Sequence, residues 1–479
     1  MALITANTRL GPVRGVLGER VREISIFRGI PFAAPPVGEF RFCTPQPPQP
    51  WSEERLCSTF SPACIQTVKP GEHKLEDSED CLYLNVYTPA KMPGEKLPVL
   101  FWIHGGGFSH GSASEAEFNG EHLCSLGAVV VTANYRCGAL GFFTLPGWTD
   151  RGGNLGLLDQ LAALYWVHDN IAAFGGDPDR VTVFGQSAGG MSARMLLTSP
   201  LAAGLMQRAI IESGGGLNEG DLVRSRADFT QMCQSAMEHL GWTEQDVLTR
   251  PAKEAANALH TAARERSPSF EVAFFQPFVD GIVLTDVPGK LIAAGQYMDI
   301  PIICGTVAGD SWMFSRKVRT QLENNENYFR AFSYAASDAW AQQQARTGRT
   351  PIFTYYFDRK QPVEGGGFHM TNGKPPFGAA TPHSSEIAYV FGTLDARKGI
   401  YTNYDRVLSD VINRFWINFA ASGDPNGDKL PWWPKYTTET PQAMHFGNET
   451  FQAERMVQNE EEQWIIDLTI AHPGMLEHL

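Results

Sequence analysis

The sequence predicts an α/β protein with a large, mostly parallel central sheet and helices on both faces. Two observations carry this prediction. Short apolar runs of strand length alternate with helix-like segments through the first half of the chain, which is typical of a parallel sheet. In addition, 43% of the 479 residues are hydrophobic and 19% are charged, so the chain can bury a sizeable core.

The expected elements follow one another in chain order. The expected strands are 97–105 (LPVLFWIHG), 128–136 (AVVVTANYR), 180–185 (RVTVFG), 207–215 (QRAIIESGG), 300–306 (IPIICGT) and 353–358 (FTYYFD). The expected helices are 156–173, 191–197, 407–421 and 460–470. Further helices around 222–270 and 315–350 are expected to decorate the sheet. No linker or repeat divides the chain, so we expect a single domain over residues 1–479.

Composition excludes several classes of function. The net charge of −13 argues against a nucleic acid or an anionic membrane as partner. The eight cysteines lack the paired spacing of zinc or thioredoxin-like sites, so we expect no metal. The N-terminal MALITANTRLGPVRG does not resemble a signal peptide, and no apolar run approaches 18 residues. We therefore expect a cytoplasmic protein, and the sequence makes no prediction of its oligomeric state.

One serine stands between glycines directly after an expected strand. In VTVFGQSAGGM, Ser187 lies two residues after Gly185 and two before Gly189. A sharp strand-to-helix turn that exposes a nucleophilic serine requires very small neighbours. On its own the motif is equally compatible with a plain glycine-rich turn, so other residues must decide.

A serine nucleophile requires a base and a group that orients the base. Asp310 follows the expected strand 300–306, and His383 lies in the later loop GAATPHSSE. Both positions are where loops leave the carboxyl ends of strands, the usual place for sites in an open α/β sheet. By position alone, each is more often a turn residue or a solvated loop residue.

An oxyanion hole is the third requirement of acyl transfer. The segment His104 to Phe108 (HGGGF) has three consecutive glycines, whose backbone N–H groups can approach a substrate closely. Ala188, the residue after the serine, would supply a further N–H group. A phosphate-binding loop is the alternative, but the Lys-Ser or Lys-Thr that should follow is missing.

The chain resembles type B carboxylesterases, a family with the α/β-hydrolase fold, almost from end to end. The resemblance is carried by FRGIPFAAPPVGEFRF (27–42), EDCLYLNVYTP (79–89), HGGGF (104–108), NYR (134–136), GNLGLLDQLAALYWVHDNIAAFGGDPDRVTVFGQSAGG (153–190), FVDG (278–281), HSSEIAYVFG (383–392) and FWINFAASGDPNG (415–427).

The resemblance implies a serine esterase that acts through an acyl-enzyme and requires no cofactor. It makes Ser187 the nucleophile and Asp310 the acid. It makes His383 the base, because His383 stands three residues before Glu386 as the histidine does in the family. The residues that would donate to the oxyanion are Gly106, Gly107 and Ala188. The expected substrates are small carboxylic esters with short-chain or aromatic groups.

Three departures from the family pattern bear on this site. The acid region usually reads Asp-Glu-Gly but is Gly309-Asp310-Ser311 here. The residue before the nucleophile is usually glutamate and is Gln186 here, from which we expect weaker attraction for cationic esters. The interval between Asp310 and the helix-like segment 328–346 is shorter than usual, so we expect a differently shaped pocket.

Further expectations concern the pocket residues, one cysteine pair and the alternative functions. Phe108, Gln186 and Trp312 are candidates for substrate binding, and Phe142, Phe143, Phe274 and Phe275 could line an apolar pocket or belong to the core. The family's outer disulfide implies a Cys64–Cys81 pair, which we expect to stay reduced in a cytosol. The alternative functions are amide, carbamate or lactone hydrolysis with the same residues, and a non-catalytic binding module.

Overall fold

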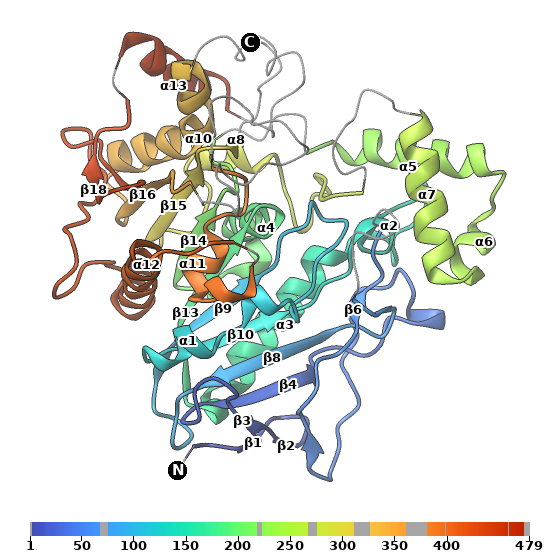
Figure 1. The fold of residues 1–479 in the computed structure, drawn as a ribbon. Helices are drawn as coiled ribbons and strands as arrows, with labels where there is room; N and C mark the ends of the chain where they lie inside the picture. Colours follow the sequence, from blue (N-terminus) through green and yellow to red (C-terminus); the bar gives the residue numbers. More distant parts are fainter. Residues whose placement is uncertain are drawn as a thin grey trace.

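A large mixed sheet forms the centre of the molecule (Figure 1). The computed structural model describes residues 2–67, 75–217, 223–266, 275–310, 326–360, 381–397, 399–457 and 459–473. Within these ranges the sheet has eleven strands in the order β18-β17-β16-β15-β14-β13-β9-β10-β8-β4-β3. In chain order they are β3 (Val16–Leu17), β4 (Ser25–Pro31), β8 (Tyr83–Thr88), β9 (Leu97–Ile103), β10 (Val129–Ala133), β13 (Gly176–Gln186), β14 (Arg208–Glu212), β15 (Ile302–Val307), β16 (Ile352–Phe357), β17 (Ala443–Phe446) and β18 (Phe451–Glu454).

The middle of this sheet is parallel. Every pairing from β10 through β9, β13, β14, β15 and β16 to β17 is parallel, and the outer pairings are antiparallel. The prediction of a mostly parallel sheet is therefore confirmed. Small additional sheets are formed by β1 (Thr5–Asn7), β2 (Pro12–Arg14) and β5 (Arg55–Leu56), by β6 (Ala63–Cys64) and β7 (Asp77–Ser78), and by β11 (Phe142–Phe143) and β12 (Gly153–Asn154).

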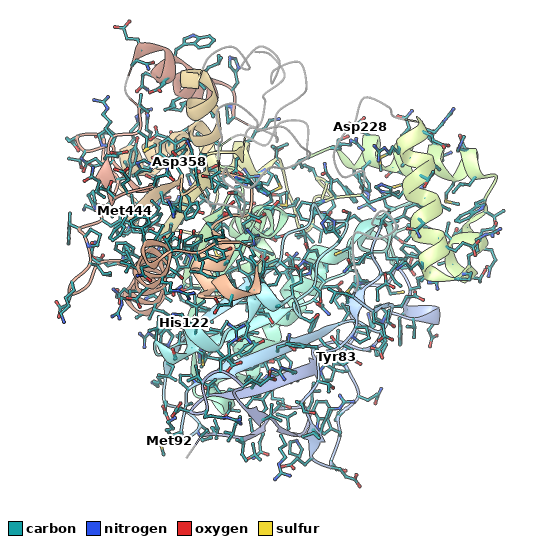
Figure 2. All side chains as sticks on the ribbon, in the orientation of Figure 1. Tyr83, Met92, His122, Asp228, Asp358 and Met444 are labelled. Carbon is teal, nitrogen blue, oxygen red and sulfur yellow. A yellow bond between two sulfur atoms is a disulfide. The ribbon has the colours of Figure 1, made fainter. Side chains whose placement is uncertain are left out.

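The central strands have continuous apolar sequences because both faces of the sheet are covered. Along β10, Val129 and Val131 pack into the core on one face, and Val130 packs into the core on the other. Neighbouring residues on β13 divide in the same way, with Val183 on the first face and Phe184 on the second. This alternation follows from the two-residue period of a strand. Side chains fill the space on both sides of the sheet in Figure 2.

Helices supply the two covering layers. The first core contains residues of α3 (Leu155–Asn170), α4 (Ala188–Thr198) and α10 (Glu326–Thr347), and the second contains residues of α1 (Glu121–Ser125), α11 (Ile387–Phe391) and α12 (Asn403–Ser422). To one side of the sheet in Figure 1 lie α5 (Arg226–Leu240), α6 (Glu244–Thr249) and α7 (Ala252–Arg266), within the interval where helices were expected. The described residues also form α-helices α2 (Gly138–Gly141), α8 (Pro288–Ala293) and α13 (Glu460–Ala471).

One helix begins earlier than the sequence predicts. Helix α4 starts at Ala188, immediately after the serine, whereas its glycines suggested a start at Met191. A Cβ on Gly189 would lie 2.0 Å from the carbonyl oxygen of Ile103, and one on Gly190 would lie 2.7 Å from that of Glu212. These glycines are helical residues whose lack of a side chain lets the first turn of α4 pack directly on β9 and β14.

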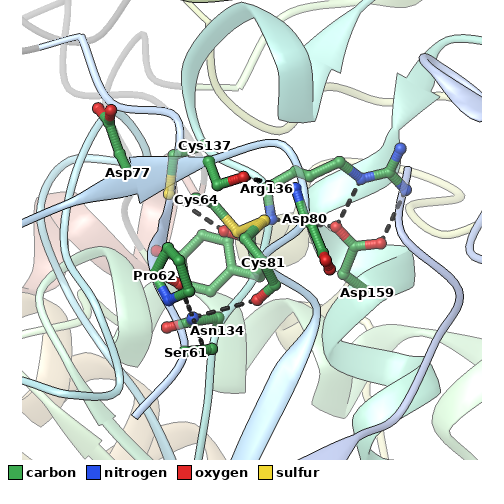
Figure 3. Close-up of a disulfide and its surroundings, with 12 residues drawn as sticks. Ser61, Pro62, Cys64, Asp77, Asp80, Cys81, Asn134, Arg136, Cys137 and Asp159 are labelled. Carbon is green, nitrogen blue, oxygen red and sulfur yellow. Dashed lines mark hydrogen bonds and ion pairs between the residues drawn. A yellow bond between two sulfur atoms is a disulfide. The ribbon is translucent and has the colours of Figure 1, made fainter. Parts of the chain in front are cut away.

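Cys64 and Cys81 form a disulfide, so the expectation that both remain thiols is wrong for this structure (Figure 3). Their Cα atoms lie 4.9 Å apart, within the range that a disulfide bridges. The amide of Asn134 holds this region by donating to the carbonyl oxygens of Cys81 at 3.1 Å and Pro62 at 3.0 Å. The sequence implied the pair but contains no information about the distance. Among the described residues the other cysteines are free thiols, at positions 43, 57, 124, 137, 233 and 304.

Candidate active site

Ser187 occupies a strained turn at the carboxyl edge of the sheet. It joins β13 to α4 with φ of 57° and ψ of −126°, a conformation that costs free energy for a residue with a side chain. A Cβ on Gly185 would lie 2.5 Å from the carbonyl carbon of Gly189, so no larger residue fits there. The turn is thus the sharp strand-to-helix junction that the sequence predicted, rather than a loose glycine-rich loop.

His383 and Asp310 lie in contact. Nδ1 of His383 is 2.5 Å from Oδ1 of Asp310, and the carboxylate is buried. Its other oxygen accepts hydrogen bonds from the Thr306 hydroxyl at 2.5 Å and from the Val307 backbone N–H at 2.9 Å. Burial acts to raise the pKa of Asp310, but the charge of His383 and hydrogen bonds from His383, Ser213 and Thr306 outweigh burial and lower that pKa. The carboxylate is therefore ionised at neutral pH.

The two loops meet because the strands before them are neighbours. Strand β15 leads to Asp310 and pairs with β16, which ends just before Asp358 (Figure 2). Asp358 accepts a hydrogen bond from the Thr381 hydroxyl at 3.3 Å, two residues before His383. A Cβ on Gly309 would lie 2.2 Å from the Thr381 carbonyl oxygen. Glycine at 309 thus allows the acid loop to lie directly against the histidine loop.

Gln186 connects the serine turn to the histidine. Its side-chain nitrogen lies 3.2 Å from Nε2 and 3.5 Å from Nδ1 of His383. Its side-chain oxygen accepts a hydrogen bond from the Ser384 hydroxyl at 3.0 Å. Because Gln186 immediately precedes Ser187, this contact brings His383 to the serine turn. The sequence suggested Gln186 as a charge difference but gave no sign of this contact.

The glycine-rich loop lies against the same turn. A Cβ on Gly105 would be 3.2 Å from the Cβ of Ser187. The carbonyl oxygen of Gly106 accepts from the backbone N–H of Ser109 at 3.0 Å, the backbone N–H of His110 at 3.2 Å and the Ser109 hydroxyl at 3.1 Å. A trans peptide directs its C=O and N–H in opposite directions. Fixing this carbonyl therefore also fixes the direction of the Gly107 N–H group on the same peptide.

The other two predicted donor peptides are held in the same way. The Gly105 carbonyl oxygen lies 2.9 Å from Nδ1 of His104, which fixes the peptide that carries the Gly106 N–H. The Ser187 carbonyl oxygen accepts from the Met191 backbone N–H at 2.8 Å, which fixes the peptide that carries the Ala188 N–H. All three donor groups thus belong to preorganised peptides.

His104 is a neutral structural histidine. Its ring stacks on Tyr135 with 4.3 Å between ring centroids, and the Tyr135 hydroxyl donates to the His104 carbonyl oxygen at 3.1 Å. Burial lowers the pKa of His104 to about 4. A neutral His104 with its proton on Nδ1 donates to the Gly105 carbonyl over the whole physiological pH range.

Two more carboxyl groups, those of Glu386 and Glu212, are buried near this site. Glu386 accepts a hydrogen bond from the Ser213 hydroxyl at 3.2 Å, and Glu212 accepts one from the Trp416 indole N–H at 2.8 Å. Burial, followed by the negative charge of Asp310, raises the pKa of Glu386 to about 7. Burial and the neighbouring Glu386 raise the pKa of Glu212 well above its ordinary value.

This arrangement of carboxyl groups was not predicted. In the sequence, Glu386 served only as a marker for the histidine, and Glu212, Ser213 and Thr306 were not among the candidates. The ends of adjacent parallel strands meet at one edge of the sheet. Residues that end neighbouring expected strands, such as Glu212 and Thr306, could therefore have been considered together.

Glu386 should make folding stability depend on pH. With an ordinary pKa of 4.5 and a folded-state pKa of about 7, the folded protein holds a proton that the unfolded chain releases. The resulting stabilisation is complete below pH 4.5 and is lost as pH rises to 7, by about 3 kcal/mol in total. In the Glu386→Gln variant, the fall in urea midpoint between pH 5 and pH 8 should therefore be smaller than in the wild type. The exposed Glu238→Gln variant is the control, and equal falls in all three proteins would contradict the assignment.

The described aromatic candidates all belong to the main core. Phe108 is buried with φ of 59° and packs edge-to-face on Phe142 at 5.5 Å between ring centroids. Phe108, Phe142, Phe143 and Phe275 are members of the same core cluster. Phe274 and Trp312 lie outside the described residues, as do residues 311–325 of the shortened interval.

The described ranges offer neither a metal-binding cluster nor a membrane-spanning helix. They contain no cluster of three or more histidine, cysteine, aspartate or glutamate side chains arranged to hold a metal ion. Every helix in the same ranges is too short or too polar to span a lipid bilayer.

Comparison with known proteins identifies the family. The model of the carboxylesterase family matches residues 3–347 and 320–465. The para-nitrobenzyl esterase of Bacillus subtilis (strain 168) is 34% identical over 492 residues, covering 92% of this chain and 94% of that protein. Carboxylesterase 4A of Bos taurus is 33% identical, covering 91% of this chain and 90% of that protein.

Solved structures give the same result. A thermophilic para-nitrobenzyl esterase superposes with a TM-score of 0.82 at 31% identity, covering 97% of this chain and all of that chain. A Geobacillus stearothermophilus carboxylesterase gives a TM-score of 0.78 at 32% identity, covering 96% and 99%. These matches confirm the α/β-hydrolase fold and the resemblance drawn from the motifs. The chain belongs to the carboxylesterase family and is a serine hydrolase of carboxylic esters.

Proposed function

We propose that Ser187, His383 and Asp310 are the catalytic triad of this esterase. The observation that carries the proposal is the 2.5 Å contact between His383 and the ionised Asp310, brought to the strained Ser187 turn through Gln186. A buried carboxylate on Nδ1 fixes the imidazole tautomer and leaves Nε2 to act as the base. These are the positions that the sequence predicted.

The proposed reaction has two halves. Ser187 Oγ attacks the ester carbonyl carbon while its proton passes to Nε2 of His383, and the imidazolium is stabilised by Asp310. The C–O bond to the alcohol then breaks, the alcohol takes the proton from Nε2, and the acyl group remains on Ser187. Water repeats the sequence on the acyl-enzyme and releases the acid. The three residues complete this cycle without a cofactor.

The N–H groups of Gly106, Gly107 and Ala188 form the proposed oxyanion hole. Their peptides are held from behind by hydrogen bonds to the carbonyls of Gly105, Gly106 and Ser187. Preorganised donors stabilise the developing negative charge without reorganising during the reaction.

The Ser109 hydroxyl offers a selective test of this oxyanion hole. Ser109→Ala removes one of the three donors to the Gly106 carbonyl, so we expect a loss of about 2- to 10-fold in kcat with KM unchanged. Ser109→Thr keeps the hydroxyl and should restore kcat. Ser125→Ala, which removes an exposed side chain-to-backbone hydrogen bond on α1, is the control. A change in KM alone would contradict the role of this peptide in the transition state.

The proposed substrates are neutral esters of short-chain or aromatic acids and alcohols. Gln186 places no charge beside the nucleophile, and Phe108 offers an apolar side chain in the glycine-rich loop. Phe108, Gln186 and Trp312 remain the proposed substrate-binding residues. Hydrolysis of amides, carbamates or lactones is the alternative, since each passes through the same tetrahedral oxyanion. The preserved Asp310–His383 contact argues against a binding module that has lost catalysis.

Hydrolysis of p-nitrophenyl acetate, butyrate and octanoate tests the proposal. We expect activity that the Ser187→Ala variant lacks, with rates that rank the acyl pocket by chain length. Failure on all three esters, together with hydrolysis of a p-nitroanilide or a lactone, would favour the alternative bond types. Failure on every compound would contradict catalysis by this site.

Two broader proposals concern the whole chain. We infer a single domain over residues 1–479, because one sheet and two continuous cores extend from β3 to β18.

The cytoplasm is the location that the sequence favours, but the Cys64–Cys81 disulfide favours an oxidising compartment. Mass spectrometry of protein alkylated directly in cell lysate would decide between them.

A further inference from the structure

The amide of Gln186 lies over the face of the His383 ring. Its nitrogen is almost equally distant from both ring nitrogens, at 3.2 Å from Nε2 and 3.5 Å from Nδ1. A donor in the ring plane beside Nε2 would be much farther from Nδ1, and one in the plane between the two nitrogens would overlap the carbon that joins them. The amide therefore sits above the ring, outside the plane in which Nε2 would accept a proton.

This placement is held from several sides. The Gln186 oxygen accepts a hydrogen bond from Ser384, which has a positive φ of 70°. A Cβ on Gly105 would lie 3.4 Å from the same oxygen, so the glycine-rich loop closes over it. The side chain is 1% exposed and is the last residue of β13. The amide is therefore a fixed part of the wall around the base.

An amide and a carboxylate at this position affect the base differently. The face of a neutral aromatic ring is negative and accepts an N–H group weakly, whereas the face of an imidazolium is positive and repels it. A carboxylate in the same place would attract the imidazolium and favour protonation of the base.

Carboxyl groups that interact with the charge of His383 are Asp310, from the loop after β15, and Glu386, at the start of α11. Burial raises the pKa of Glu386 to about 7, so Glu386 is protonated in acidic solution. The end of β14 contributes Glu212, whose pKa burial raises well above its ordinary value. Of these carboxyl groups, Asp310, whose pKa is lowered, is thus the one that is ionised in acidic solution.

We propose that Gln186 is a positioning residue for His383 that places an uncharged amide, in place of a carboxylate, against the face of the base, so that this position adds no negative charge that would favour protonation of the base. The proposal rests on the catalytic roles proposed above. It also predicts a preference for neutral esters, because Gln186 places no anion beside the nucleophile to attract a cation.

Two variants of similar side-chain size separate charge from shape. Gln186→Glu adds a negative charge, and Gln186→Met adds none. The measurement is the pH profile of kcat/KM for p-nitrophenyl butyrate and for the cationic ester butyrylthiocholine. We expect the acid limb of Gln186→Glu to move up by about one pH unit or more, and that of Gln186→Met to stay in place. The ratio of cationic to neutral ester hydrolysis should rise about 10-fold in Gln186→Glu and fall again with added salt.

The positioning role has its own test in Ser384→Ala, which removes the hydrogen bond that holds the amide. We expect kcat to fall several-fold at every pH with no shift of the acid limb. Active Gln186→Glu protein with an unshifted limb, or an equal shift in Gln186→Met, would overturn the proposal. Unchanged kcat in Ser384→Ala would overturn the positioning role. A wild type that fails to hydrolyse either ester would instead contradict the proposed function, so the two failures are distinguishable.

Discussion

The Ser187→Ala variant is expected to lose about 10⁵- to 10⁶-fold in kcat for ester hydrolysis while keeping the fold. The reason is the strained turn, which presents a single hydroxyl beside the glycine-rich loop and next to the residue that contacts His383. Without that hydroxyl no acyl-enzyme forms, and only binding and the oxyanion hole remain. The measurement is p-nitrophenyl butyrate hydrolysis together with a thermal melt.

Ser192→Ala is the matched control for this variant. Ser192 is a buried serine on α4, five residues after Ser187, and it accepts a hydrogen bond from Gln160 at 3.0 Å. Its loss should reduce stability by about 1 kcal/mol and leave kcat within a few-fold of wild type. If Ser187→Ala hydrolysed the ester as fast as Ser192→Ala, Ser187 would not be the nucleophile.

The second large effect is expected for Asp310→Asn, which should lower kcat about 10⁴-fold. Asparagine keeps the size of the side chain but removes the charge that stabilises the imidazolium. It also presents an N–H group to Nδ1, which favours the wrong imidazole tautomer. The pH profile of the residual activity and the melting temperature should be recorded with the rate.

Asp338→Asn is the control for the loss of a buried carboxyl group. Asp338 is 1% exposed on α10 and accepts a hydrogen bond from Gln342 at 2.9 Å, far in sequence from the triad. Its substitution should change stability but not the pH profile. Wild-type activity in Asp310→Asn would mean that another carboxylate orients the base, and the double variant with Glu386→Gln would then identify it.

Asp310, the proposed acid, contacts Nδ1 of His383 although its side chain is one methylene shorter than the glutamate usual in the family. The Thr306 hydroxyl and the Val307 backbone N–H hold one oxygen of Asp310, and Gly309 allows the loop to touch the histidine loop at Thr381. The close approach of the two loops therefore lets the shorter aspartate side chain reach the histidine. The sequence could place Asp310 at the end of a strand but could not measure that approach.

The strands and the site were predictable for different reasons. Strands β9, β10, β13, β14 and β15 were evident because strands buried on both faces are continuous apolar runs. Ser187 was evident because its turn requires small neighbours. Contacts between distant segments were not, since nothing in a single sequence encodes the distance from Gln186 to His383, or from Ser213 to Glu386. The start of α4 was misjudged because glycines that permit close packing look like glycines that end a helix.

The most direct test of the triad is to trap the nucleophile with a fluorophosphonate and locate the adduct by peptide mass spectrometry. We expect one equivalent of label on Ser187, loss of hydrolysis in step with labelling, and labelling slowed by orders of magnitude in Asp310→Asn. A label on another residue, or full hydrolysis by protein labelled at Ser187, would contradict the proposed triad.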